Sequence, residues 1–178
     1  MHRLFVAIRP PRAIREQLLA VMGGVAEVRW QTEDQLHITL RFIGEVDRHK
    51  ASDIAIALAS VRHPPFEVSL NGIGTFGRRG QPGVLWAGLA PHEPLKALHK
   101  KLDHACARAG VSTEGRAYQP HITLARLKRS SGSIQAVAET WAGLTSPPFA
   151  VDSFELFQSS LTSDGAVYHV VERYSLLS

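Results

Sequence analysis

Apolar and polar residues alternate along the chain in short blocks that predict strands and helices in turn. Runs rich in β-branched and aromatic residues, bounded by turn-forming residues, predict strands. These cover Leu4–Ile8, Val28–Trp30, Leu36–Ile43, Phe66–Leu70, Val84–Leu89, Pro120–Leu127, Phe149–Phe157 and Val167–Tyr174. Alanine-rich or amphipathic stretches predict helices at about Pro11–Met22, Asp47–Val61, Pro91–Ala109 and Ser133–Trp141. The glycine-rich segment Gly72–Gly83, which contains Arg78 and Arg79, predicts a loop or hairpin.

Two of the predicted strands carry the same tetrapeptide. His37-Ile38-Thr39-Leu40 recurs as His121-Ile122-Thr123-Leu124. Because side chains alternate between the two faces of a strand, His and Thr share one face in each copy, while Ile and Leu turn into a core. Each copy therefore presents an imidazole beside a hydroxyl group.

A second marker repeats in phase with the first. Pro64-Pro65-Phe66 recurs as Pro147-Pro148-Phe149, at nearly the spacing that separates the two histidine motifs. Two markers in phase, with a helix between them in each case, predict an internal duplication. We expect one domain over residues 1–178, with lobes at about 1–80 and 84–178. A pseudo-twofold axis between such lobes would bring His37 opposite His121.

Composition sets broad limits on the class of protein. The chain has 178 residues, of which 44% are hydrophobic and 20% charged, as is typical of a soluble globular domain. Its net charge of +4 slightly favours an anionic partner. The single Cys106 excludes an internal disulfide and suits a reducing compartment. The apolar run Leu4–Ile8 is too short for a signal segment and no run reaches a transmembrane length, so a cytoplasmic location without membrane contact is expected.

The residue types narrow the chemistry to proton transfer. The chain lacks His-x-His, His-Glu-x-x-His and paired cysteines, so no metal ion or other cofactor is expected. It also lacks the Gly-x-Ser-x-Gly signature of an activated serine. Two imidazoles without a nucleophile suit in-line cleavage of a phosphodiester, with one as base and one as acid. The hydroxyls of Thr39 and Thr123 would then donate to the non-bridging phosphate oxygens.

Two arginines follow the motifs. Arg41 lies two residues after Thr39 and is expected to share its face, which makes it a candidate phosphate clamp. Arg126 has the opposite parity to His121, and would reach the same face only across a bulge or at a frayed strand end. Either arginine could instead be a solvated strand end. Possible base-stacking surfaces are Phe5, Trp30, Phe42 and Tyr118.

At these residues the chain resembles the two-histidine (2H) phosphoesterase superfamily, which is defined by a pair of His-x-Thr-x motifs. Within it, the chain is similar to the bacterial and archaeal RNA 2′,3′-cyclic phosphodiesterases, also called LigT-like 2′-5′ RNA ligases. The similarity runs nearly end to end. It is carried by Arg3–Ile8, Arg29-Trp30, His37–Val46, Pro64–Phe66, Val84–Trp86, Pro120–Arg126 and Tyr168–Val171, with Tyr118 in place of the usual phenylalanine.

The resemblance implies a bilobal α+β fold, with two antiparallel-rich sheets about a pseudo-twofold axis, helices outside and a central cleft. It implies a monomer that needs no metal and acts on RNA ends carrying a 2′,3′-cyclic phosphate, such as tRNA halves, or on a cyclic nucleotide. The product would be a 2′-phosphomonoester. His37 would protonate the departing 3′ oxygen, and His121 would act as base to water. Joining RNA halves through a 2′-5′ linkage would be the same chemistry with a ribose hydroxyl in place of water.

Two alternatives remain open at the level of sequence. One is a hydrolase of another small phosphodiester, such as a 2′-5′ oligoadenylate or a cyclic ADP-ribose phosphate, because no loop carries a readable substrate code. The other is a non-catalytic module that binds RNA ends. Loss of a motif histidine would be the signature of such a module, and both His37 and His121 are present.

Overall fold

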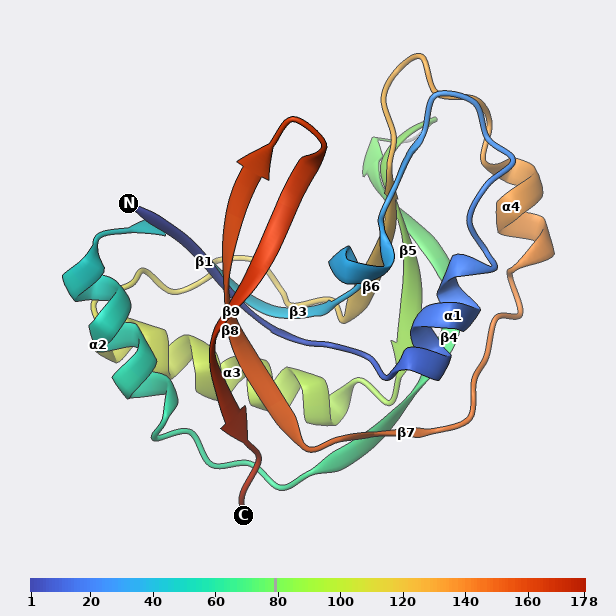
Figure 1. Ribbon diagram of the computed structural model, residues 1–178. Coiled ribbons are helices and arrows are strands. Elements are labelled where there is room, and N and C mark those ends of the chain that lie inside the picture. Colours follow the sequence, from blue (N-terminus) through green and yellow to red (C-terminus); the bar gives the residue numbers. More distant parts are fainter. Residues whose placement is uncertain (79) are drawn as a thin grey trace.

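The strands of the protein form a curled antiparallel sheet with helices on its outer side (Figure 1). The computed structural model describes residues 1–78 and 80–178, so Arg79 of the predicted loop lies outside the described residues. The strands are β1 (His2–Ile8), β2 (Arg29–Trp30), β3 (Ile38–Val46), β4 (Phe66–Arg78), β5 (Gln81–Ala90), β6 (His121–Arg126), β7 (Phe149–Val151), β8 (Ser153–Thr162) and β9 (Gly165–Ser175). The helices are α1 (Arg12–Leu19), the 3₁₀ turn η1 (Glu33–Gln35), α2 (Arg48–Leu58), α3 (Glu93–Arg108) and α4 (Gln135–Thr140).

The sheet consists of two wings that meet at the repeated motifs. In the described part of the chain the strand order is β7-β4-β5-β6-β3-β1-β8-β9, and β2 pairs with β6. The central strands β3 and β6 pair where Ile38 lies opposite Ile122. On one side of this junction the sheet extends from β3 through its neighbours β1, β8 and β9. On the other side it extends from β6 through β5, β4 and β7. The expected α+β fold is confirmed, with its two sheets present as the wings of one strand order.

The wings do not coincide with the expected lobes 1–80 and 84–178. Strand β4 comes from the first half of the chain but pairs with β5 and β7 of the second half. Strands β8 and β9 come from the second half, and β8 pairs with β1 of the first. Each half of the sequence therefore completes the wing of the other, which ties the two halves into one domain. The duplication itself stays a prediction, which this exchanged arrangement supports.

The core lies between the sheet and helices α2 and α3, which pack against each other below it (Figure 1). Along β1, Leu4, Val6 and Ile8 face this core, whereas Phe5 and Ala7 form a separate cluster with Phe157 on the opposite face. Helix α3 buries one continuous stripe, consisting of Leu95, Leu98, Leu102, Ala105 and Cys106. The motif strands thus rest on a packed layer, and their other face is free to form a site.

Several element boundaries differ from the sequence predictions for local reasons. Helix α2 starts at Arg48 because the Asp47 carboxylate caps it, accepting a hydrogen bond from the Lys50 amide at 2.8 Å. The glycine-rich segment after Leu70, for which the sequence allowed a loop or a hairpin, is mostly paired strand, since β4 and β5 form a long hairpin. The predicted strand Phe149–Phe157 is interrupted at Asp152, where the chain passes from one wing to the other.

Candidate active site

The side chains of both motifs lie on the concave face at the centre of the sheet. Ile38 and Ile122 are opposite each other and fully buried in the core. Their chain neighbours must point the other way because side chains alternate along a strand. The register therefore brings His37 and Thr39 of one motif onto the same face as the corresponding pair of the other, as the repeat predicted.

Each motif histidine makes an equivalent hydrogen bond to the backbone. Nδ1 of His37 donates to the carbonyl oxygen of Gln35 at 3.0 Å, and Nδ1 of His121 donates to that of Gln119 at 2.7 Å. A carbonyl oxygen can only accept, so Nδ1 carries the proton of each neutral ring and Nε2 is left as the free base. The glutamine two residues before each histidine was overlooked in the sequence analysis, although its repetition is visible there.

An aromatic cluster from the first wing surrounds His37. The rings of Phe5, Phe157 and Tyr168 meet it edge-on, at centroid distances of 6.0, 4.7 and 5.3 Å. His37 is only 6% exposed, and burial lowers its pKa to about 4. Its Nε2 atom is buried and has no hydrogen-bond partner among the described residues. An unpaired buried nitrogen of this kind favours the neutral ring until a ligand reaches it.

His121 lies in a similar cluster from the second wing. Its ring is perpendicular to Phe76 at 4.8 Å and lies 6.1 Å from Trp86. Burial lowers the pKa of His121 as well, and the hydrogen bond to Gln119 partly opposes that shift. Trp86 can lie flat over β4 because Gly74 has no side chain there; a Cβ at Gly74 would come within 2.3 Å of the indole. Each imidazole is thus fixed by aromatic rings of its own wing.

A cavity of about 760 Å³ lies against the motif face. It is lined by Thr39, Leu40, Phe42, Phe76, Val84, the loop Glu114–Gln119, His121, Thr123 and Arg126. Of the six residues proposed from the sequence, four line this cavity, namely Thr39, His121, Thr123 and Arg126. His37 belongs to the same face but sits behind its aromatic cluster, and Arg41 lies elsewhere.

A β-bulge at the last residue of each motif decides where the two arginines point. On β3, Thr39 pairs with Ala7 but Arg41 pairs with Val6, so Leu40 is left over. The second motif strand repeats this irregularity at the equivalent position, where Leu124 is left over between its pairs with β5. The extra residue reverses the parity of the residues that come directly after it. The sixth residue of each motif segment, Phe42 or Arg126, therefore returns to the motif face and borders the cavity.

The expectation that Arg41 shares the face of Thr39 is wrong, because the bulge at Leu40 turns it toward helix α3. Its side chain is 4% exposed, and its Nε donates to the Asp103 carboxylate at 2.8 Å. The same guanidinium also bonds the carbonyl oxygens of Phe42 and Ser112 and lies 3.8 Å from the Glu114 carboxylate. Arg41 is therefore fully used in holding the loop before β6 and is not a phosphate clamp.

Arg126 reaches the motif face across a bulge, which is one of the two ways that the sequence analysis allowed. Its parity was opposite to that of His121, and the bulge at Leu124 corrects this. The side chain is exposed and borders the cavity beside Val84. A guanidinium at the rim of a cavity with imidazole and hydroxyl groups is suited to an anion.

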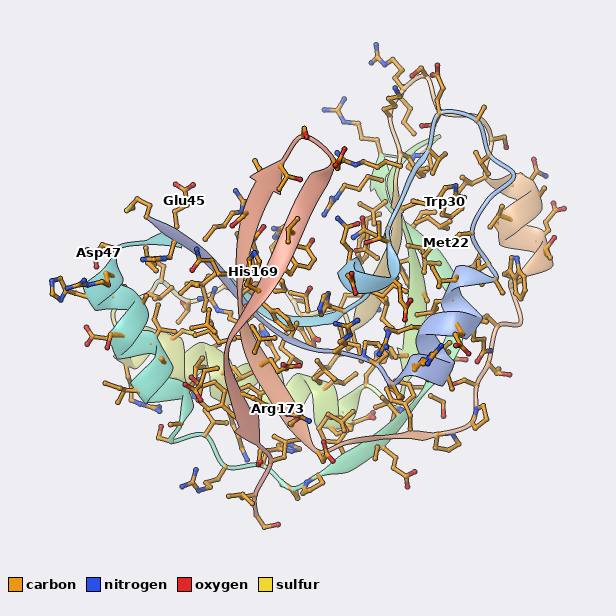
Figure 2. All side chains as sticks on the ribbon, in the orientation of Figure 1. Met22, Trp30, Glu45, Asp47, His169 and Arg173 are labelled. Atoms are coloured by element: carbon orange, nitrogen blue, oxygen red, sulfur yellow. The ribbon has the colours of Figure 1, made fainter. Side chains whose placement is uncertain are left out.

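The aromatic residues proposed for base stacking differ in accessibility. Phe5 is buried against His37, and the Tyr118 hydroxyl donates to the Thr39 carbonyl oxygen at 2.8 Å. Trp30 lies opposite Ala125, on the side of the molecule away from α2 (Figure 2). Only Phe42, among these four, is both exposed and at the cavity.

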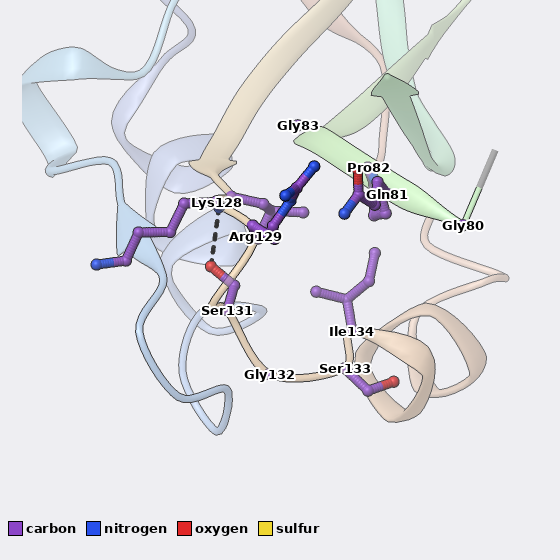
Figure 3. Close-up of a pocket in the computed structure, with 11 residues that line it drawn as sticks. Gly80, Gln81, Pro82, Gly83, Lys128, Arg129, Ser131, Gly132, Ser133 and Ile134 are labelled. Atoms are coloured by element: carbon purple, nitrogen blue, oxygen red, sulfur yellow. Dashed lines mark hydrogen bonds between the residues drawn. The ribbon is translucent and has the colours of Figure 1, made fainter. Parts of the chain in front are cut away.

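A second cavity of about 390 Å³ lies between the β4–β5 hairpin and the segment after β6 (Figure 3). It is lined by Gly80, Gln81, Pro82, Gly83, Leu127, Lys128, Arg129, Ser131, Gly132, Ser133 and Ile134. The Lys128 amide donates to the Ser131 hydroxyl at 2.9 Å within it. None of the residues proposed from the sequence lines this cavity, so the motif face is the candidate active site.

The described residues offer neither a metal cluster nor a membrane-spanning helix. His, Cys, Asp and Glu side chains there form no group of three or more that could hold a metal ion. Among the helices described, none is long and apolar enough to cross a membrane.

Comparison with known families decides the class of protein. The family described as the 2′-5′ RNA ligase superfamily matches residues 9–162, a stretch that contains both motifs and both bulges. The chain belongs to this superfamily. Among curated relatives of the superfamily, an RNA 2′,3′-cyclic phosphodiesterase of Archaeoglobus fulgidus is 31% identical, with 93% of this chain and 96% of that protein covered. The protein of the same description from Escherichia coli is 32% identical, with 98% and 96% covered.

Solved structures agree with this assignment to the superfamily. Escherichia coli LigT complexed with 3′-AMP matches with a TM-score of 0.79 and 30% identity, covering 99% of each chain. TT0787 of Thermus thermophilus matches with a TM-score of 0.77 and 27% identity, covering 98% of this chain and 97% of that one. The similarity extends over the whole fold, including both wings.

Proposed function

We propose that this protein hydrolyses the 2′,3′-cyclic phosphate at RNA ends to a 2′-phosphomonoester, using His37 and His121 as acid and base. The observation that carries the proposal is the matched state of the two imidazoles. Both sit on one face of the sheet, and both have Nδ1 committed to a backbone carbonyl oxygen, which leaves Nε2 of each ring as the nitrogen free for proton transfer.

The reaction is an in-line displacement at phosphorus. The base takes a proton from water as the water oxygen forms its bond to phosphorus. The bond from phosphorus to the 3′ oxygen breaks on the opposite side, and the acid gives its proton to that oxygen. Following the family resemblance, His121 is the base and His37 the acid.

The proton that His37 must donate is acquired with the substrate. In the free protein burial holds its pKa near 4, so the ring is neutral at neutral pH. An anionic phosphate next to Nε2 favours the charged imidazolium and raises that pKa. The buried, unpaired Nε2 atom also gains a hydrogen-bond partner in this way. Substrate binding and protonation of His37 are therefore coupled.

Three further groups stabilise the charge on the non-bridging oxygens. The hydroxyls of Thr39 and Thr123 lie beside the imidazoles, and both residues line the cavity. Arg126 adds a full positive charge at its rim. Preoriented donors of this type act most strongly where charge is concentrated in the transition state. The proposed reaction needs only these side chains and is therefore independent of metal ions.

The choice of substrate is supported by the relatives. Proteins covering nearly the same length in Archaeoglobus fulgidus and Escherichia coli are described as RNA 2′,3′-cyclic phosphodiesterases. Escherichia coli LigT has been solved with 3′-AMP and with phosphate. Ligation through a 2′-5′ bond would use the same step with a ribose 5′-hydroxyl in place of water, and the superfamily description favours this second reaction. Water is far more abundant, so hydrolysis is proposed as the main outcome.

The test compares three substrate types under one set of conditions. Cyclic 2′,3′-nucleotides, RNA oligomers ending in a cyclic phosphate, and 2′-5′ linked RNA are incubated with the protein, and the products are separated by chromatography. We expect turnover of the first two to 2′-phosphates. Faster turnover of 2′-5′ linked RNA would replace the cyclic phosphate as substrate. Absence of turnover, or release of 3′-phosphates, would contradict the proposal.

A further inference from the structure

The backbone of the first motif is held differently from that of the second. Strand β6 has β5 on one side and β2 on the other, and at its bulge the Leu124 carbonyl oxygen accepts the Gln31 amide at 2.8 Å. In the described pairing, β3 meets β6 at Ile38 and continues from there beside β1. At the bulge of β3, two side chains bond the carbonyl oxygens of Thr39 and Leu40.

His99 of helix α3 bonds the carbonyl oxygen of Leu40. Its Nδ1 donates to that oxygen at 2.6 Å, and Nδ1 must carry the proton because a carbonyl oxygen can only accept. Its Nε2 lies 3.8 Å from the Glu114 carboxylate. The His99 side chain is 12% exposed and does not belong to the lining of the motif cavity. His99 therefore contacts the motif strand from behind the cavity wall.

Tyr118 contacts both His99 and the motif strand. Its ring lies parallel to the imidazole, with the centroids 4.3 Å apart and 6° between the planes. Its hydroxyl donates to the Thr39 carbonyl oxygen at 2.8 Å. Burial raises the pKa of this hydroxyl, which therefore keeps the proton that the bond requires. The two stacked rings thus bond the carbonyl oxygens of two consecutive residues.

These two bonds fix the peptide planes on either side of Leu40. The extra residue of a bulge has no partner across the ladder, so pairing alone does not set its backbone conformation. Rotation of the plane between Thr39 and Leu40 would move the Thr39 side chain relative to the cavity that it lines. A displacement of about 1 Å near the reacting atoms can cost about 10²-fold in rate.

We propose that His99 is a positioning residue for the first motif. Together with Tyr118 it holds the bulge at Leu40, so that the Thr39 hydroxyl points at the phosphate. The role of the Thr39 hydroxyl in this inference rests on the proposed function. The two motif copies then differ in how they are held, since the backbone amide of Gln31 does at the second bulge what the His99 side chain does at the first.

The test measures kcat and KM on adenosine 2′,3′-cyclic phosphate, with and without the hydroxyl that is to be positioned. His99→Leu keeps an apolar side chain but no donor, and should lower kcat by roughly 5- to 50-fold while KM changes by less than about threefold. In a Thr39→Val protein the same substitution should lower kcat by less than about twofold, because no hydroxyl remains to be aimed. His99→Asn places an amide N–H near the position of Nδ1 and should keep kcat within about threefold of the original.

His63→Leu is the matched control. Nδ1 of His63 also bonds a backbone carbonyl oxygen, that of Pro64 at 2.7 Å, and His63 is buried between α2 and β4, outside the cavity lining. This variant should lose stability and keep kcat within about twofold. Circular dichroism shows which variants fold. If His99→Leu does not, His99→Gln replaces it with the same expectation, since its amide lies toward the Nε2 side of the imidazole and not at Nδ1.

The outcomes separate this inference from the proposed function. If the original protein does not turn over the cyclic nucleotide, the proposed function fails. If it does, and His99→Leu lowers kcat equally with and without the Thr39 hydroxyl, the positioning role alone is overturned. A fall of kcat in His63→Leu as large as in His99→Leu, or a failure of His99→Asn to retain activity, would also overturn it.

Discussion

Ile38 lies directly opposite Ile122, and this pair joins the two wings of the sheet at the centre of the candidate site. Both side chains are fully buried in the core beneath the sheet. The alignment of the two histidines on the other face therefore depends on how well these two residues pack. Stability and catalytic geometry share one structural element.

Shortening Ile122 should affect both properties. In Ile122→Ala the lost contacts and the resulting void should lower the free energy of unfolding by about 2–5 kcal/mol. The kcat on a cyclic nucleotide should fall as well, since the motif strands lose their fixed register. Urea denaturation and steady-state kinetics measure the two effects. Ile56→Ala, at an exposed position, should change stability by less than about 0.5 kcal/mol, and a similarly small change in Ile122→Ala would contradict the account.

The burial of His37 makes the protein less stable in acid. Its pKa is about 4 when folded and 6.5 for the free side chain, so between these pH values the unfolded chain binds more protons. The free energy of unfolding is therefore at its full value above about pH 6.5. It decreases by about 3 kcal/mol as the pH falls toward 4. Urea denaturation of the original protein and of His37→Asn, at pH 7 and pH 4, measures the difference. Equal pH dependence in both proteins would show that His37 titrates normally.

The same environments shift the pH dependence of activity. The proposed hydrolysis needs one neutral and one charged imidazole, so kcat/KM should be bell-shaped in pH. Burial lowers the pKa of both His37 and His121 in the free protein. The maximum of the bell should therefore lie below pH 6.5, the ordinary imidazole pKa. Initial rates at low substrate concentration between pH 4 and pH 9 measure the curve. A maximum above pH 7 would mean that other groups control the rate.

The two arginines should behave oppositely when each is replaced by methionine. Arg41→Met leaves the Asp103 carboxylate without its partner and should cost about 3–5 kcal/mol of stability. Arg126→Met should leave stability within about 0.5 kcal/mol, because the side chain is exposed. The loss of its charge should instead lower kcat by about 10²–10³-fold. Thermal denaturation and kinetics on both variants measure this contrast. The reverse pattern would restore Arg41 as the phosphate ligand.

The contrast between these arginines shows how far the sequence could lead. The shared face of His37 and Thr39 follows from strand alternation, which is a local property, and the in-phase repeat was enough to place the second motif opposite the first. The bulges at Leu40 and Leu124 leave no residue signature, because neither contains a glycine or a proline. The assumption of regular strand alternation therefore placed Arg41 on the wrong face.

Long-range pairing was equally hidden in the sequence. The run Phe149–Phe157 reads as one strand because no glycine or proline breaks it, although Asp152, Ser153 and Glu155 are polar. The backbone nevertheless leaves one wing and enters the other at that residue. Which wing a strand joins depends on the packing of the whole sheet, and hydrophobic pattern alone carries no information about it. The halves of the sequence were therefore predicted as separate lobes, while the structure exchanges strands between them.

In the proposed mechanism His37 and His121 act as a pair and no metal takes part. Replacing either residue with Ala should lower kcat/KM on a cyclic nucleotide by about 10²–10⁴-fold. The double variant should lose less than the product of the two effects, because both groups act in one transition state. EDTA should leave the activity of the original protein unchanged. Inactivation by EDTA that a divalent ion reverses would return a metal to the mechanism.

The most direct measurement divides the two roles with a modified substrate. A cyclic phosphate with sulfur in place of the 3′ oxygen has a leaving group that needs no proton. With His37 as the acid, this substrate should restore much of the activity lost in His37→Ala and little of that lost in His121→Ala, when kcat/KM is compared with the oxygen substrate. Rescue of His121→Ala alone would reverse the assignment, and equal rescue of both variants would contradict acid–base catalysis by this pair.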